Sequence, residues 1–203
     1  MSTRQKLIFI ILLTACTCYG ENIDPYTDSS QYAYGENVGW LNFEPGTGDG
    51  VQVDSDKLTG YVWAENIGWI NLSPSVYGGV FNDGSGNLLG YAWGENVGWI
   101  NFDPKVPGNP ADYGVTIDSD GDFNGWAYGE NIGWIHLAST SPVPYGVKAC
   151  VVTLDDLQNF ASYWLDTDSV AGNIDGTGNV NNSDFAILAS YWLDFCPDGW
   201  QLK

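Results

Sequence analysis

Basic residues are scarce in this sequence, and their scarcity excludes one class of partner. Six Lys and Arg stand against 25 Asp and Glu, which gives a formal net charge of −19. A surface of this sign repels the phosphate backbone, so no nucleic acid is expected as a partner. The same carboxylates suit a hard cation such as Ca²⁺, which takes oxygen ligands.

Long apolar runs are missing as well, except near the N-terminus. Residues 7–15 form an apolar core after Arg4 and Lys6, and nine residues are too few to cross a bilayer as a helix. This pattern predicts a signal peptide over residues 1–20. The protein is therefore expected to be secreted, extracellular or at the cell surface, with no transmembrane helix in the mature chain.

Cysteine is rare, and its count bears on how the signal is processed. Cleavage after Gly20 leaves only Cys150 and Cys196, which can form one disulfide in an oxidising compartment. The alternative is lipoprotein anchoring at Cys16, which ends a lipobox-like segment and leaves Cys18 unpaired. Cysteine parity favours ordinary secretion and a Cys150–Cys196 disulfide.

Catalytic patterns are absent. The sequence has no zinc-ligand spacing, phosphate-binding loop or nucleophile elbow. Its one histidine, His136, occupies a slot that holds asparagine in three similar segments, which favours a structural hydrogen-bonding role over catalysis. No catalytic residue is assigned, and the protein is expected not to be an enzyme.

Aromatic residues and glycine are abundant, with ten Trp, twelve Tyr and 26 Gly. The segment GYAWGENVGWINF at residues 90–102 has three near-copies, which begin at Gln31, Gly60 and Gly125. Their shared Glu residues are spaced by 29, 30 and 35 positions (65−36, 95−65 and 130−95). A period near thirty residues indicates a repeat architecture.

Each copy is predicted to form a three-stranded unit. An opening strand such as GVTID (114–118) leads through a turn-rich loop to YAW or WAY, then to GENVG and a last strand such as WINF. The fold class is thus a mainly β N-terminal module of four three-stranded repeats over residues 31–149, after a short linker at 21–30. The orphan strand YGVKA (145–149) would complete the first unit, which favours a closed ring, propeller-like or a barrel, over an open stack.

The repeated side chains allow two interpretations each. Strand alternation places Tyr91 and Trp93 on one face. A buried aromatic core is favoured; the alternative is an exposed carbohydrate-binding platform, with Trp63, Trp93 and Trp126 as its residues. The GEN tripeptide is interpreted as a turn in which Glu and Asn side chains bind local backbone N–H groups.

A different pattern begins at Cys150. The segments TLDDLQNFASYWLD (153–166) and NNSDFAILASYWLD (181–194) repeat with an offset of 28 (184−156). Apolar residues recur at i, i+3, i+4 and i+7, which predicts two amphipathic helices with Asp156 and Asp184 capping their N-termini.

The stretch NIDGTGNVNNSDFAILASYWL, which begins at Asn173, resembles the dockerin type I repeat. The resemblance implies a small α-helical dockerin-like domain over residues 150–203. It also implies one weak Ca²⁺ site at most, because the loop before Asp156 lacks side-chain ligands. The implied calcium residues are Asn173, Asp175, Thr177, Asn179, Asn181 and Asp184.

Dockerins dock onto cohesins, often in systems that degrade polysaccharides. The resemblance implies a cohesin-like or cell-surface protein as partner, contacted through Asn182 and Ser183. The function expected from the sequence is a secreted, non-catalytic recognition or scaffold protein with a protein-docking domain. The alternative is a carbohydrate-binding module, or an accessory protein or enzyme of polysaccharide catabolism.

Overall fold

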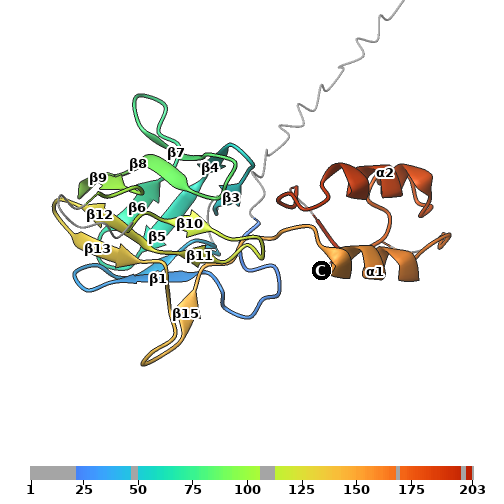
Figure 1. Cartoon of the computed structure of the whole chain (residues 1–203), viewed down its shortest axis with the longest axis horizontal. Helices are drawn as coiled ribbons and strands as arrows, with labels where there is room; N and C mark the ends of the chain where they lie inside the picture. Colours follow the sequence, from blue (N-terminus) through green and yellow to red (C-terminus); the bar gives the residue numbers. More distant parts are fainter. Residues whose placement is uncertain (1–21, 47–49, 106–112, 168–169, 198–199, 203) are drawn as a thin grey trace, which may run out of the picture.

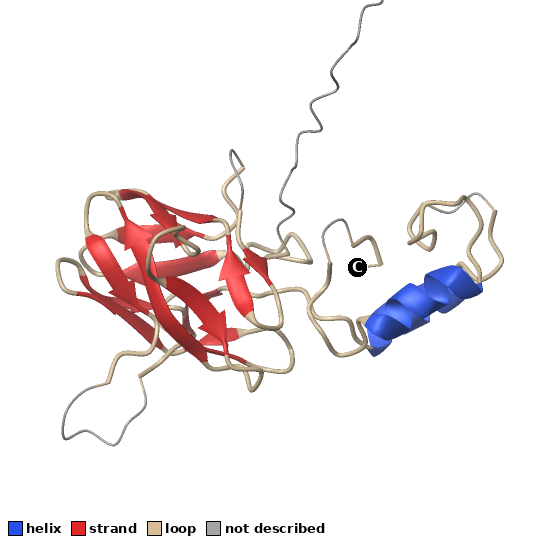
Figure 2. Cartoon of the chain, turned by 90° about the horizontal axis from the view of Figure 1, so that it is seen from above, coloured by secondary structure: helices blue, strands red, loops and turns tan. Residues whose placement is uncertain are grey.

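The structure is a computed structural model that describes residues 22–46, 50–105, 113–167, 170–197 and 200–202. The predicted signal peptide with Cys16 and Cys18 lies outside these residues. Figure 1 shows a mainly β body next to two short helices, and Figure 2 shows the same body from above, with one helix visible beside it. In the described part of the chain, no helix has the length and apolar character needed to span a membrane.

The β body is a closed barrel of eight strands. Within an eleven-stranded sheet, the strands follow the order β8-β6-β5-β2-β1-β13-β12-β9, and pairing of β9 with β8 closes the ring. The barrel strands are β1 (Tyr32–Gly35), β2 (Gly39–Asn42), β5 (Tyr61–Ala64), β6 (Gly68–Asn71), β8 (Leu88–Gly94), β9 (Gly98–Asn101), β12 (Trp126–Gly129) and β13 (Gly133–His136). Closure, which the sequence left as one of two alternatives, is confirmed.

Four hairpins supply these strands, and each hairpin comes from one GEN segment. The pairs β1–β2, β5–β6, β8–β9 and β12–β13 share one register, in which the residues flanking a three-residue turn face each other. In the first hairpin, Gly35 pairs with Gly39. Gly39 has a φ of +75°, a left-handed conformation that closes three-residue hairpin loops and suits glycine.

Shorter strands form a second set of pairs beside the barrel. They are β3 (Gln52–Val53), β4 (Lys57–Thr59), β7 (Gly79–Asn82), β10 (Thr116–Ile117), β11 (Phe123–Asn124), β14 (Ala138–Ser139) and β15 (Tyr145–Gly146). Strands β14 and β15 form a projecting ribbon, with β15 labelled below the barrel in Figure 1.

The segment after β15 joins the last hairpin to the first. The backbone N–H of Phe123 donates to the carbonyl of Val147, and that of Lys148 donates to the carbonyl of Ser30. An antiparallel bridge also links Val147 with Gln31. Residues 147–149 thus pair with both Phe123 and Gln31, whereas Tyr145–Gly146 belong to the projecting ribbon, and completion of the first unit by this segment stays a prediction.

The expected linker at 21–30 is corrected in part. Ile23 is only 2% exposed, belongs to the barrel core and forms a bridge with Ala149. The backbone N–H of Asn22 donates to the carbonyl of Val51. Residues 22–24 therefore supply sheet pairings that the first unit would otherwise lack, which the 31–149 boundary missed.

The barrel interior holds small and branched side chains. Ala and Val positions of the first strand of each hairpin face Leu and Ile positions of the second, and all are at most 3% exposed: Ala33, Leu41, Val62, Ile70, Ala92, Ile100, Ala127 and Ile135. An eight-stranded barrel is just wide enough to be filled by side chains. Fully burying each Leu, Ile or Val contributes about 1.5–3 kcal/mol.

The predicted aromatic core is therefore wrong. In each hairpin the rings alternate with the interior residues and lie on the outer face; Trp63 is 39% and Trp93 37% exposed. The physical reason is the width of the barrel, because an interior already filled by Ala, Val, Leu and Ile has no room for a ring in every hairpin.

The helices are α1 (Leu154–Ser162) and α2 (Asn182–Ser190), both shorter than predicted. Phe160 and Leu188 are buried in a second apolar cluster, separate from the barrel core. The predicted apolar stripe is wrong at three of its four aromatic positions, because Trp164, Phe185 and Trp192 are 43%, 45% and 40% exposed and only Phe160 is buried.

Candidate functional site

The outer face of the barrel carries a band of aromatic rings, here called the aromatic belt. Each hairpin contributes three rings, and the two on its first strand contact the Trp of its second strand, mostly edge to face, as for Trp93 and Trp99, whose centroids are 4.7 Å apart at 65°. The belt consists of Tyr32, Tyr34, Trp40, Tyr61, Trp63, Trp69, Tyr91, Trp93, Trp99, Trp126, Tyr128 and Trp134. Cross-strand pairing fixes these contacts, since Trp93 faces Trp99 in the register of the hairpin.

A groove of about 840 Å³ lies on the belt between the third and fourth hairpins, and is here called the aromatic groove. Its aromatic lining is Tyr77, Tyr91, Trp93, Trp99 and Tyr128; its polar lining includes Asn101, Glu130 and Asn131. Apolar walls with a few convergent polar groups are typical of ligand sites of this size.

A second groove, of about 620 Å³, occupies a related place between the first and second hairpins. It is lined by Tyr32, Trp40, Glu65 and Tyr145. In both grooves the Trp of one hairpin stands beside the Glu of the next hairpin's turn, Trp40 with Glu65 and Trp99 with Glu130. The repeated sequence thus places a Trp and a Glu in both grooves, while the rest of the lining differs.

The three Trp residues assigned to the carbohydrate-binding alternative have different surroundings. Trp93 lines the aromatic groove. Trp63 is exposed and packs against Trp69, with centroids 4.9 Å apart. Trp126 is half-buried and stacks on His136, with centroids 3.8 Å apart and ring planes 5° from parallel.

The sequence did not single out three rings of the groove. Tyr128 is the copy of Trp93 in the fourth hairpin, and Trp99 is the copy of Trp40, Trp69 and Trp134, so the repeated pattern could have pointed to both. Tyr77 lies outside the hairpins, in the segment YGGV, which resembles YGV at 113–115 and 145–147. That shorter repeat could have identified Tyr77 as an aromatic residue of the repeated surface.

Each GEN turn is closed by a local backbone bond, such as that from the N–H of Val38 to the carbonyl of Gly35, and its Asn side chain links it to the neighbouring turn. Each turn's Asn side chain donates to a backbone carbonyl of the preceding turn; Asn66 Nδ2, for example, lies 3.1 Å from the Val38 oxygen. The other donors are Asn37 to Ile132, Asn96 to Ile67 and Asn131 to Val97. The prediction of local bonds by Asn is therefore wrong, because each of these bonds joins neighbouring hairpins around the ring. The Glu of each turn is exposed.

His136 takes part in an aromatic cluster at the seam between the fourth and first hairpins. It stacks on Trp126, and its Nδ1 lies 3.3 Å from the hydroxyl of Tyr145. Burial lowers the pKa of His136 and raises that of Tyr145. The surroundings are those of a structural side chain, and the corresponding Asn42 accepts a bond from the N–H of Glu44.

Both helices begin with a capping box. Thr153 and Asn181 are the N-caps, and the carboxylates of Asp156 and Asp184 accept bonds from the N-cap N–H groups. Asp156 also accepts a 2.7 Å bond from the indole N–H of Trp200, while Asp184 accepts one from the N–H of Asp175. The predicted capping role of both Asp residues is confirmed.

The residues implied for calcium form hydrogen bonds within the turns before α2. Asn173 Oδ1 accepts from the N–H of Gly178, and Asp175 Oδ1 accepts from the N–H and hydroxyl of Thr177. Asn181 donates its side-chain amide to the carbonyl of Asn179. Within the described residues, no three His, Cys, Asp or Glu side chains are grouped to hold a metal ion. The donor set, with one Asp beside Asp184, fits a strong Ca²⁺ site poorly, and calcium stays a prediction.

The predicted partner residues Asn182 and Ser183 form the exposed first turn of α2. Larger apolar side chains lie beyond the ends of the helices. Leu165 and Leu193 are 70% and 69% exposed and have positive φ values of 66° and 61°. Each follows a half-exposed tryptophan, so the doubled ASYWLD sequence displays the same pair of side chains twice.

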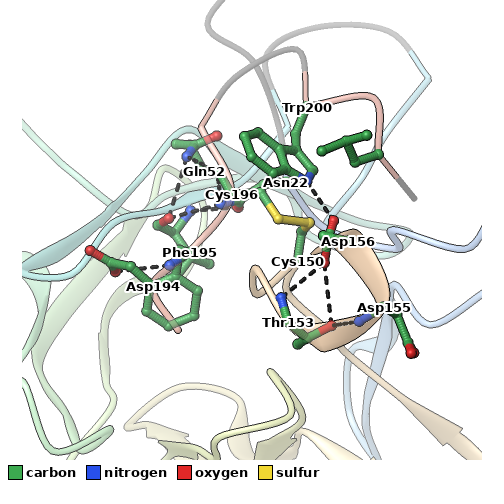
Figure 3. Close-up of a disulfide and its surroundings, with 12 residues drawn as sticks. Asn22, Gln52, Cys150, Thr153, Asp155, Asp156, Asp194, Phe195, Cys196 and Trp200 are labelled. Atoms are coloured by element: carbon green, nitrogen blue, oxygen red, sulfur yellow. Dashed lines mark hydrogen bonds between the residues drawn. A yellow bond between two sulfur atoms is a disulfide. The ribbon is translucent and has the colours of Figure 1, made fainter. Parts of the chain in front are cut away.

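The predicted disulfide between Cys150 and Cys196 is confirmed, with the Cα atoms 5.3 Å apart. Figure 3 shows it beside Trp200, Asp156 and the first turn of α1. On the barrel side, the side chain of Asn22 donates to the carbonyl of Cys196 at 3.0 Å and to that of Val53 at 2.9 Å. The cysteines therefore stand where the barrel meets the helices.

Comparisons with protein-family models, with curated proteins and with solved structures give no match. Function is therefore inferred from the geometry of this chain alone.

Proposed function

We propose that the barrel binds a neutral polysaccharide on its aromatic belt, in a secreted protein that has no catalytic role. The observation that carries this proposal is the exposure of the repeated Trp residues beside a groove. An exposed indole offers a flat apolar face, and the C–H face of a pyranose ring is complementary to it. If these rings were buried, their role would be to stabilise the fold and they could not contact a ligand.

The electrostatics favour an uncharged ligand. The chain carries a formal net charge of −19, and Glu130 stands at the aromatic groove. Uronate or sulfate groups would meet a like charge there, which is unfavourable. The polar groups of Asn101 and Asn131 can exchange hydrogen bonds with sugar hydroxyls without any charge on the ligand.

The repeats support the same function. We infer that the barrel consists of four copies of one three-stranded unit, in which the orphan strand completes the first copy. A polysaccharide repeats its ring along the chain, so a surface that repeats its aromatic groups can engage more than one sugar at once. Several weak contacts then add up to useful retention.

Retention on insoluble polysaccharide tests this function. The protein, expressed from the full chain, is incubated with cellulose, xylan, mannan and chitin, and with polygalacturonate as an anionic comparison, in calcium and in chelator. We expect retention on at least one neutral polymer and none on polygalacturonate. Trp93→Ala should weaken binding about tenfold, the loss of one stacked ring.

The matched control is Trp164→Ala, which removes an equally exposed indole outside the barrel. Equal retention of the Trp93 and Trp164 variants would contradict the proposal, as would failure of the unaltered protein to bind any neutral polymer. Loss of retention in chelator alone would place a metal ion at the binding surface.

A second function is proposed for the helical region, namely docking onto a cohesin-like or cell-surface protein. It is supported by the two exposed Leu residues, which are held outward at positive φ at equivalent places after α1 and α2. The two functions are compatible, since one concerns the barrel and the other the helices.

A further inference from the structure

A tyrosine precedes the opening valine of three units. Tyr113 and Tyr145 stand two positions before Val115 and Val147 (115−113 and 147−145), with one glycine between. In the third unit the sequence is Tyr77-Gly78-Gly79-Val80, so the tyrosine stands three positions before its valine (80−77). One extra glycine distinguishes this unit from the other two.

Where the spacing is two, the tyrosine ring packs on the belt. Tyr113 contacts Trp134 with centroids 5.4 Å apart, and Tyr145 contacts Trp40 at 5.2 Å. Both tyrosines are half-buried. Trp134 and Trp40 occupy the same place in their hairpins as Trp99 does in the third.

Tyr77 is displaced from that position. It is 84% exposed, and among the described residues it makes no ring contact with Trp99 or any other aromatic side chain. Gly78 lies against Trp99 instead, so closely that a Cβ on it would be 2.5 Å from the indole Cζ3. The extra glycine thus separates the tyrosine from its tryptophan.

The backbone at Tyr77 is strained. Tyr77, Gly78 and Gly79 have consecutive φ values of 63°, 80° and 111°. A bulky side chain at positive φ is uncommon, and such residues cluster at ligand clamps and functional sites. Here the strained residue is also one wall of the aromatic groove, beside Tyr91, Trp93 and Trp99.

We propose that Tyr77 is a clamp that closes over a neutral pyranose ring bound in the aromatic groove. The sugar takes the place that the tyrosine ring occupies against the equivalent tryptophan in the first and fourth hairpins, and it is held between Tyr77 and Trp99. This inference depends on the proposed carbohydrate binding, and it specifies which face of the barrel binds most tightly. The two adjacent glycines give the backbone beside Tyr77 the conformational freedom that such closure needs.

Three variants of Tyr77 and its neighbours test the clamp. Tyr77→Ala removes one of the two rings that would hold the sugar. We expect binding to the neutral polymer that retains the protein to weaken about fivefold to tenfold, mainly through faster dissociation. Tyr77→Phe keeps the ring and should bind within about twofold of the unaltered protein, because stacking needs no hydroxyl. Deletion of Gly78 restores the two-position spacing and should seat Tyr77 on Trp99, which closes the groove and lowers affinity.

The control is Tyr26→Ala, an exposed tyrosine outside the groove, which should leave affinity unchanged. Soluble oligosaccharides of the retained polymer supply affinity and dissociation rate, with tryptophan fluorescence as the readout. Fluorescence also verifies folding of each variant before binding is compared.

The outcomes separate the clamp from the function. If the unaltered protein binds but Tyr77→Ala binds equally well, the clamp is wrong and carbohydrate binding stands. If Tyr77→Phe loses as much as Tyr77→Ala, the hydroxyl acts and the stacking clamp is wrong. If the unaltered protein binds no neutral glycan, or binds a proline-rich peptide instead, both proposals fail.

Discussion

His136 is the residue at which the fourth hairpin departs from the other three. The equivalent positions in the other hairpins hold Asn42, Asn71 and Asn101. The imidazole ring of His136 stacks on Trp126, a contact that an asparagine side chain cannot make. Burial lowers the pKa of His136, so the folded protein favours the neutral imidazole. Tyr145, whose hydroxyl lies beside the ring and whose pKa is raised by burial, carries no charge that would offset this.

The pH dependence of stability follows from that shift. A histidine whose folded pKa is depressed stabilises the fold fully above its ordinary value near 6.5, and this stability is lost as the pH falls from there toward the folded pKa. His136→Asn should reduce the loss of unfolding free energy between pH 7.5 and 5.5. The difference should be on the order of a few tenths of a kcal/mol, because the half-exposed ring is screened by solvent. Urea unfolding of both proteins at the two pH values measures it, and identical losses would contradict the expectation.

Hairpins are the elements that the sequence predicted best. Gly-rich turns, alternating residues and the thirty-residue period were enough to find all four. The side of the barrel that each ring occupies was not predictable from one hairpin. In YAW, either the alanine or the flanking rings can face inward, and the choice depends on how narrow the closed barrel is.

The bonds between turns show a second limit of the same kind. Asn96 donates to the carbonyl of Ile67, 29 residues earlier in the chain. A local sequence window cannot contain both partners, so the favoured interpretation was that the asparagine side chain bonds within its own turn. Only the ring of four hairpins brings each asparagine to its neighbour's carbonyl.

The helix termini carry the docking function proposed for the C-terminal region. The N–H of Leu165 donates to the carbonyl of Val180, and that of Leu193 donates to the carbonyl of Val152, so the backbone of each exposed leucine is fixed by the segment before the other helix. The double variant Leu165→Asp, Leu193→Asp should weaken binding to a cohesin-type module by more than about tenfold, because two apolar anchors become charged.

Folding of that variant should be unimpaired, since both side chains are largely exposed. Surface plasmon resonance with the full chain gives the affinity. Leu154→Asp, at an equally exposed position at the start of α1, is the matched control. A double variant that binds as well as the control would rule out this patch as the docking surface.

At the scale of the molecule, the apolar core of the barrel and the apolar cluster of the helical region are joined by a short junction around Cys150 and Cys196. The barrel core and the cluster around Phe160 share no residue, and the second cluster contains both Cys150 and Cys196. This junction contains the disulfide, the hydrogen bond from the Asn22 side chain to the carbonyl of Cys196, and the antiparallel bridge between Val151 and Phe195. A cluster this small leaves its region marginally stable without a covalent link.

Removal of the disulfide should therefore destabilise the C-terminal region more than the barrel. The closed loop spans 46 residues, and losing the constraint should cost the C-terminal region about 4 kcal/mol in the loop-entropy account. The barrel should persist, because the N–H groups of Ala149 and Lys148 bond to Gly121 and Ser30 independently of the cysteines. In the variant Cys150→Ser, Cys196→Ser, helical circular dichroism should disappear at a lower urea concentration than the tryptophan fluorescence of the belt. Reduction of the unaltered protein should reproduce this separation, whereas a single shared transition in both would mean that the barrel and helices unfold as one unit.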